Sequence, residues 1–332
     1  MAGLKPKEED IIVRTSKDGV VRKTIRNWFC GNPRRHFVIP LFQRRYLWGQ
    51  SQCRKLFEDA LSASAIKLHD LGTVMVFVNE KDQVVIVDGQ QRATTLMILF
   101  ASLQKRGVDV SHIIYLKDSP VLVPTYHDQL PFCSVINNQK PVGESNIITT
   151  ASLFESWTSI LTPDEIDKIT KNVLDHFTVL EFTIPRGDDA ENLQVVYERL
   201  AIRSIGILTL LFDSSPGISN GVMDLTRNLF LSYYSQDDAI RIYHSHWMPL
   251  EVLVAEDDPV YSEAAEIKFT ARLKAFLSDK QWDILSEEKK GKLGVYFSLK
   301  RYVENRTHLE NTTQVTPIIQ ELLDFKIPSD PT

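Results

Sequence analysis

The feature that most constrains the fold is a strand, turn and helix pattern in residues 84–106, VVIVDGQQRATTLMILFASLQKR. Four β-branched residues at 84–87 predict a buried strand, and Asp88-Gly89 is a turn signal. Apolar residues at helical spacing follow Arg92 and predict a helix. The turn would place an acid, two amides and a guanidinium at the helix N-terminus, where free N–H groups and the helix dipole favour a phosphate. Polar residues that only cap the helix would produce the same pattern, so this alternative stays open.

A second polar segment lies upstream, in FVIPLFQRRYLWG at residues 37–49. Phe37–Ile39 predicts a short strand that Pro40 ends. Gln43-Arg44-Arg45 then stands among aromatic residues. Guanidinium forks suit phosphate oxygens, and aromatic residues interleaved with basic ones can stack nucleobases. The alternative is an aromatic segment that fills the core and carries arginines at its edge.

The composition limits the function. The chain has 332 residues, of which 43% are hydrophobic and 24% charged, and this predicts a soluble globular protein with room for two domains. A formal net charge of -5 argues against broad, sequence-blind nucleic-acid binding, which needs a basic surface. A local basic patch remains compatible with this charge, so nucleic acid stays an open question as a partner.

The cysteines and the apolar runs bear on the compartment. Cys30, Cys53 and Cys133 are widely spaced and form no CxxC pair, which argues against a zinc site and a disulfide framework. The first residues lack the apolar core of a signal peptide, and no window approaches roughly 18 continuous apolar residues. We therefore expect no membrane partner and a cytoplasmic location, with the nucleus as the alternative.

The order of elements changes along the chain. In the first part, 72–79 and 83–87 read as an antiparallel hairpin, and 113–116 as a short strand. Helical patterns dominate from residue 147 onward. The expected helices are 21–29, 51–65, 147–161, 163–177, 191–202, 223–234, 237–255, 260–278, one around 295–303 and one around 318–323, with a strand at 178–185. The change of pattern at 140–147 predicts a first domain at 11–145 and a mainly helical domain at 146–330.

Other catalytic motifs are absent from the sequence. There is no P-loop, GxGxxG, HExxH or GxSxG pattern. His127-Asp128 is a polar pair in a proline-rich stretch, where such pairs are more often structural than functional. His244-Ser245-His246 is the one close histidine pair, and it lacks the further ligands that zinc needs.

Taken together, FVIPLFQRRYLWG and VVIVDGQQRATTL resemble the N-terminal domain family of the GmrSD-type restriction enzymes. The family pattern is F-x-IP-x-[FY]QR-x-Y-x-W followed by DGQQR-x-TTL, and the sequence matches both halves nearly position for position. Weaker likenesses occur at 122–136, at Tyr197-Glu198-Arg199-Leu200 and at Met223–Asn228. The close likeness covers about residues 20–135.

The resemblance implies an α+β chain, with a ParB/sulfiredoxin-like domain around a small mixed sheet followed by a mostly helical part. It also implies binding of ATP or GTP with Mg2+, and Asp88 would hold the metal or polarise a hydroxyl or water. The implied catalytic residues are Asp88, Gln91 and Arg92. The implied nucleotide-binding residues, which position the phosphates and neutralise their charge, are Gln43, Arg44, Gly89, Gln90, Gln91, Arg92, Thr94 and Thr95. The accessory positions are Tyr46, Trp48, His127 and Asp128.

The chain departs from the family pattern in two places. The later family helix usually continues into an LNxxG turn, but here Arg199-Leu200 is followed by Ala201-Ile202-Arg203, so we expect no nucleotide contact from that turn. The full restriction enzymes also carry an HNH-type nuclease domain, whose histidine motif does not occur in this sequence. We therefore expect no DNA cleavage by this chain alone.

Three functions compete at this point. The first is Mg-dependent hydrolysis of a nucleoside triphosphate by a sensor or regulatory module in nucleic-acid defence, acting with a separate effector protein. The second is an ATP- or ADP-dependent kinase that phosphorylates a small-molecule acceptor, with Asp88, Glu58 or Asp59 as general base. The third is a binding module that retains the fold without catalysis.

Overall fold

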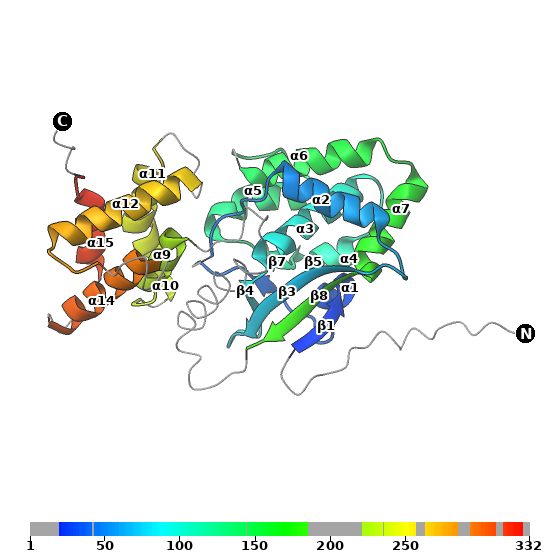
Figure 1. Cartoon of the computed structure of the whole chain (residues 1–332). Coiled ribbons are helices and arrows are strands. Elements are labelled where there is room, and N and C mark those ends of the chain that lie inside the picture. The colour runs from blue at the N-terminus through cyan, green and yellow to red at the C-terminus, as the bar shows by residue number, and fades with distance from the viewer. Residues whose placement is uncertain are drawn as a thin grey trace, which may run out of the picture. The chain divides into compact units, whose positions relative to one another are not determined.

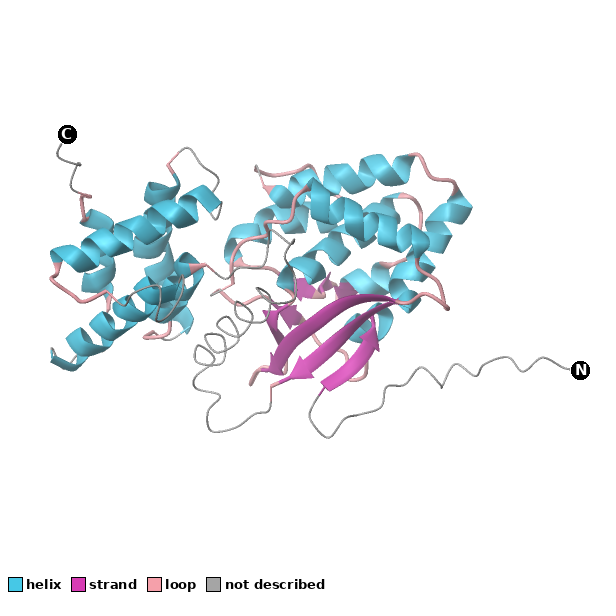
Figure 2. Ribbon diagram, in the orientation of Figure 1, coloured by secondary structure: helices cyan, strands magenta, loops and turns pink. Residues whose placement is uncertain are grey.

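A computed structural model of the chain describes residues 20–41, 43–143, 145–184, 221–234, 236–256, 263–284, 293–309 and 315–327. The chain divides into two compact units, Met1–Ala190 and Glu191–Thr332. The described strands all belong to the first unit, and the described part of the second unit is helical (Figure 2). The predicted α+β class is thus confirmed.

A six-stranded mixed sheet organises the first unit (Figure 1). The order across the sheet is β1 (Val20–Thr24), β8 (Phe177–Thr183), β3 (His69–Val78), β4 (Val84–Asp88), β2 (Phe37–Val38) and β7 (Leu122–Val123). Strand β3 pairs antiparallel with β4, with Val78 opposite Val84, so the predicted hairpin is confirmed. Strand β1 is antiparallel to β8, whereas β3 with β8, β4 with β2, and β2 with β7 are parallel pairs. A separate ribbon pairs β5 (Tyr115–Leu116) with β6 (Ser119–Pro120).

Helix α3 (Gln90–Lys105) is the centre of the first unit. Every residue of 90–103 except Arg92 is buried, because α3 packs against α5, α6 and α7 as well as the sheet. Its continuous apolar sequence therefore reflects a core helix rather than an amphipathic surface helix. The other helices of this unit are α1 (Ile25–Cys30), α2 (Gln50–Ser62), α4 (Ser111–Ile114), α5 (Tyr126–Ile136), α6 (Asn146–Ser159), α7 (Pro163–Lys171) and the π-helical turn η2 (Asn172–His176).

The domain boundary predicted at 145/146 is corrected by the structure. Strand β8 is hydrogen-bonded between β1 and β3, and α6 packs on α3, so residues 146–183 belong to the first unit. The helical pattern that begins at residue 147 is a local signal, whereas the return of the chain to the sheet is a pairing with strands far upstream. Local periodicity does not report such a pairing.

Several local predictions also change. The helix expected at 21–29 begins only at Ile25, because Val20–Thr24 pairs with β8 as strand β1. Ile113 and Ile114 end the short helix α4 instead of starting a strand, and only the next two residues pair as β5. The helix expected at 163–177 has the predicted start at Pro163, where Thr162 and Glu165 bond each other's backbone N–H, and it continues from α7 through the π-helical turn η2 to His176. The helix expected at 191–202, the likeness at 197–200 and the departure at 201–203 lie outside the described residues.

The second unit packs its helices around an apolar core that includes Trp247, Phe269 and Phe276. This agrees with the mainly helical part expected from the sequence. None of the helices in the described ranges is long and apolar enough to cross a membrane. The helical elements are α9 (Val222–Leu231), α10 (Gln236–Ile242), the π-helical turn η4 (Tyr243–Trp247), α11 (Met248–Ala255), α12 (Glu263–Asp279), α14 (Gly294–Leu309) and α15 (Thr316–Asp324).

Candidate functional site

The turn between β4 and α3 depends on Gly89. Its φ of 104° lies in the left-handed region, which residues with a Cβ adopt only with backbone strain. A Cβ at this position would also lie 2.7 Å from Cγ1 of Val74, which stands on the neighbouring strand β3. The glycine therefore lets the chain turn tightly against the sheet and start α3 immediately after Asp88.

The first turn of α3 has no side-chain cap. Ala93 N–H donates to the carbonyl of Gly89 at 3.0 Å and starts the helical bonding, and no described side chain accepts from the N–H groups before it. Because the N-cap residue is Gly89, no N-cap side chain bonds the first turn, and the polar residues of the motif make the contacts described below. Gln90, the first residue of the helix, is buried at 6% exposure. Uncapped N–H groups at the positive end of a 16-residue helix form an anion-binding geometry.

Arg92 and Asp88 stand together beside this turn. The Asp88 side chain is 53% exposed, and its Oδ2 accepts from Arg92 Nη2 at 3.1 Å. Arg92 Nη1 donates to the carbonyl of Leu71 at 2.6 Å, and the arginine side chain is 18% exposed. Since the guanidinium is held from two sides, its remaining N–H groups have a fixed direction. The site thus combines a fixed cation with an accessible carboxylate.

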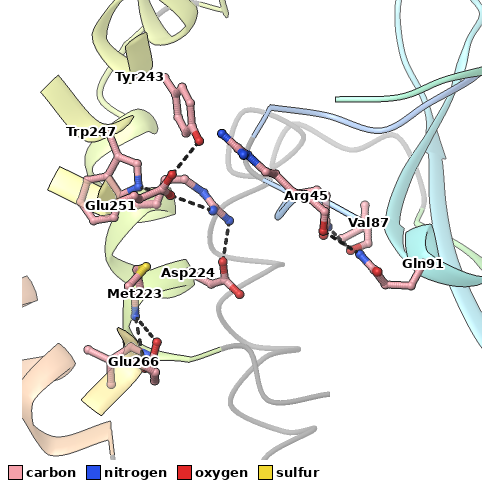
Figure 3. Close-up of polar contacts among 12 residues, drawn as sticks. Arg45, Val87, Gln91, Met223, Asp224, Tyr243, Trp247, Glu251 and Glu266 are labelled. Atoms are coloured by element: carbon pink, nitrogen blue, oxygen red, sulfur yellow. Dashed lines mark hydrogen bonds and ion pairs between the residues drawn. The ribbon is translucent and has the colours of Figure 1, made fainter. Parts of the chain in front are cut away.

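Gln91 ties the two sequence motifs together. Its Oε1 accepts from the backbone N–H of Leu47 at 2.7 Å and of Trp48 at 3.3 Å. Its Nε2 donates to the carbonyl of Arg45 at 3.0 Å (Figure 3). One side-chain amide thus satisfies three backbone groups of the upstream segment. The role of Gln91 in this structure is therefore to hold residues 45–48 against the start of α3.

Two further side chains join the same elements. Gln43 is buried, and its Nε2 donates to the carbonyl of Val87, one residue before Asp88, at 2.5 Å. Tyr46 is buried, and its hydroxyl lies 2.7 Å from Oγ1 of Thr95, which in turn donates to the carbonyl of Gln91. Burial, with a smaller effect from Cys53, raises the pKa of Tyr46 well above its ordinary value, so the tyrosine stays neutral.

The predicted accessory pair lies next to this segment. Asp128 Oδ2 accepts from the backbone N–H of Tyr46 at 2.7 Å and from the Thr125 hydroxyl at 3.2 Å. Burial raises the pKa of the Asp128 carboxyl above its ordinary value. His127 Nδ1 lies 3.4 Å from Nη2 of Arg45. Both accessory residues therefore contact the segment after Gln43 rather than the DGQQR turn itself.

The structure separates the predicted site residues into groups. At the turn, Asp88 is exposed, Arg92 is partly exposed and Gln90 is buried, and Arg44 is half-buried in the segment tied to the turn. The residues that bind the backbone or fill the core are Gln43, Tyr46, Gln91, Thr94, Thr95 and Asp128, and Trp48 packs half-buried against the core. Sequence reasoning missed the carbonyl of Leu71, the hydroxyl of Thr125, and Asn146, whose Nδ2 donates to the carbonyl of Leu47 at 3.1 Å. No local motif marks these three.

The proposed alternative bases and the histidine pair lie on other contacts. Glu58 is exposed at 3.9 Å from Arg54, and Asp59 lies 3.5 Å from His69. His246 Nδ1 is 2.6 Å from the Ser245 hydroxyl in η4 of the second unit. No group of three or more metal-binding side chains occurs in the part of the chain that the structure describes. The turn offers one exposed carboxylate, that of Asp88, and proteins commonly bind Mg2+ through one or two carboxylates together with phosphate oxygens and water.

The second unit contains a buried ion network that the sequence did not reveal (Figure 3). Arg227 is 0% exposed and pairs with Asp224 at 2.8 Å and with Glu251 at 3.4 Å. Glu251 also accepts from the Tyr243 hydroxyl at 2.8 Å and from Trp247 Nε1 at 2.6 Å. This network fixes the packing of α9 against α11 and η4, so the Met223–Asn228 likeness falls on an interior segment of the helical unit.

The first unit is thus an α+β domain in which a strand-to-helix turn presents backbone N–H groups, an arginine and a carboxylate. The family described as GmrSD restriction endonuclease, N-terminal domain, matches residues 25–207. This match spans more than half of the chain, so the chain belongs to that family, and the resemblance seen in the two motifs is confirmed. Among curated proteins, no match was found.

Proposed function

We propose that the family domain binds a nucleoside triphosphate with Mg2+ at the N-terminus of α3 and promotes cleavage of its terminal phosphate. The observation that carries the proposal is the uncapped first turn of α3, flanked by Arg92 and Asp88. Phosphate oxygens match such N–H groups in charge and in direction. The acidic character of the whole chain does not oppose this, because the site is local.

The residues of the site would act mainly by position and charge. The N–H groups of the first turn and the Arg92 guanidinium would bind phosphate oxygens and stabilise the charge that develops on them. Asp88, together with phosphate oxygens, would hold Mg2+, which supplies further charge neutralisation when bound. Arg44 would approach from the segment that Gln91 and Gln43 tie to this turn. Positioning and electrostatic stabilisation of this kind account for most catalysis of phosphoryl transfer.

The family description places the domain in restriction systems. We therefore propose that nucleotide use by this chain serves nucleic-acid defence together with a separate effector protein. Transfer of the phosphate to a small-molecule acceptor is the second candidate, and it rests on the fold expected from the two motifs. The two reactions differ in one measurement: hydrolysis releases phosphate from ATP or GTP alone, whereas transfer requires an added metabolite pool.

Thermal stability with nucleotide tests the binding step. ATP or GTP with Mg2+ should raise the unfolding temperature, because a ligand at about 100 times its Kd stabilises by about 2.7 kcal/mol. Arg92→Ala should abolish this shift. Arg106→Ala is the matched control, since Arg106 follows the other end of α3 and donates to the carbonyl of Leu161. A wild-type protein that no triphosphate stabilises would refute the proposal.

A further inference from the structure

The segment at residues 43–48 has no regular secondary structure, yet side chains from three helices bind its backbone. Asp128 on α5 accepts the N–H of Tyr46, and Asn146 on α6 donates to the carbonyl of Leu47. Gln91 on α3 binds the backbone of residues 45, 47 and 48. A segment held in this way has its conformation set by the surrounding helices rather than by its own bonding.

Asp128 is the only charged member of this set, and it is 6% exposed. Its Oδ2 accepts two hydrogen bonds, from the Tyr46 N–H and from the Thr125 hydroxyl. An acid in a nucleotide-binding domain would ordinarily be assigned as a metal ligand or a general base. Here the two hydrogen bonds of the carboxylate, from an N–H and from a hydroxyl, require only an oxygen that accepts, and the nearby charge of Arg45 is the interaction that a neutral amide would lose.

We propose that Asp128 is a positioning residue for the phosphate site: it holds Tyr46 so that Arg44 is presented beside the first turn of α3, whereas the Arg45 guanidinium lies against His127. The inference rests on the proposed function, because it assigns Arg44 to the nucleotide. The backbone N–H of Tyr46 donates to Asp128, and the hydroxyl of Tyr46 is hydrogen-bonded to Thr95 of α3, so the residue is fixed at its backbone and at the end of its side chain. Arg44 and Arg45 lie between this anchor and Gln43, which is bonded to β4.

Two substitutions separate an oxygen from a charge at this position. Asp128→Asn keeps an acceptor for the Tyr46 N–H and removes the charge, whereas Asp128→Ala removes both. Titration calorimetry with ATP and Mg2+ should show Kd raised about tenfold in Asp128→Ala, equivalent to about 1.4 kcal/mol. Asp128→Asn should stay within about threefold of the wild type. An Asp128→Asn protein as deficient as Asp128→Ala would overturn the inference and would mark the charge as a metal ligand or a base.

Asn172→Ala is the matched control for general destabilisation. Asn172 is also buried in the first unit, and its Nδ2 donates to the carbonyl of Ala60 at 2.8 Å, away from residues 43–48 in sequence. This variant should lower the unfolding temperature and leave the Kd for ATP unchanged. An equal loss of affinity in Asn172→Ala and Asp128→Ala would show that stability, not positioning, is the cause.

Tryptic cleavage after Arg44 and Arg45, identified by mass spectrometry, measures the hold on the segment without any nucleotide. Cleavage there should be faster in Asp128→Ala than in the wild type, and near wild type in Asp128→Asn. If the wild type binds no ATP, the proposed function fails and the presentation of Arg44 fails with it. If instead ATP binds and cleavage is unchanged in Asp128→Ala, only the positioning role is refuted.

Discussion

Replacing Gly89 by alanine should be among the most costly single substitutions in the first unit. A residue with a Cβ at a φ of 104° costs about 1–2 kcal/mol in backbone strain. The new Cβ would lie 2.7 Å from Val74 Cγ1, and Val74 is fully buried on β3, so the contact cannot be relieved by a move into solvent. Overpacking of this kind adds about 1–3 kcal/mol. We therefore expect Gly89→Ala to lower the free energy of unfolding by about 2–5 kcal/mol in total.

Gly107 provides a control that separates the two terms. Its φ is 91°, but no atom lies within 4 Å of the position that a Cβ would take, so Gly107→Ala should show the backbone strain alone. Unfolding in urea should be monitored through hydrogen exchange at the amides of β4 and α3. This probe reports the first unit alone, which matters because a chain with two units need not unfold in one step. The double variant Gly89→Ala, Val74→Ala should lose less stability than the sum of the losses measured for the two single variants. A Gly89→Ala protein no less stable than Gly107→Ala would refute the reasoning.

Three further substitutions follow from the buried polar groups. Gln91→Glu should destabilise the first unit by about 1–3 kcal/mol, because a carboxylate oxygen would face the carbonyl of Arg45, and urea titration measures this. Arg227→Ala should cost about 3–5 kcal/mol by removing the positive charge that faces the buried carboxylates of Asp224 and Glu251, which calorimetric unfolding of the second unit would show. Burial, and then the charge of Asp224, raise the pKa of Glu266 from 4.5 to about 7, so the folded chain binds this proton more tightly than the unfolded chain. The contribution of Glu266 is therefore complete below about pH 4.5 and falls by ~3 kcal/mol as the pH rises through 7, and Glu266→Gln should flatten this slope in unfolding curves measured across that range.

The strand, turn and helix at residues 84–105 were predictable from the sequence because the signals are local. Four β-branched residues, a turn dipeptide and a long apolar stretch each favour one conformation in a single window. The same reasoning failed at residues 146–183, where β8 returns to the sheet between β1 and β3. Such pairing joins residues about 100 or more positions apart, and no periodicity within a window encodes it.

The site was predicted as a set of residue types, but their division of labour was not predictable. A glutamine beside a phosphate-binding turn and a glutamine that binds a neighbouring backbone have the same sequence signature. Gln91 differs from Gln90 only in the direction of its side chain on the first turn of α3, which points it at residues 45–48. The buried partners of Asp128 were equally hidden, because Thr125 and Asn146 carry no motif.

The spacing of the family pattern has a physical basis in these bonds. In F-x-IP-x-[FY]QR-x-Y-x-W the open positions after the arginine fall on Arg45 and Leu47, and Gln91 binds both of them through their backbone groups only. Any side chain fits such a contact. The specified Gln43 and Tyr46 instead use their side chains, on the carbonyl of Val87 and on Thr95. The two motifs therefore form one unit in space. Gln91 of the downstream motif binds the backbone of the upstream motif, and Gln43 and Tyr46 of the upstream motif bind β4 and α3, so each motif holds the other in place.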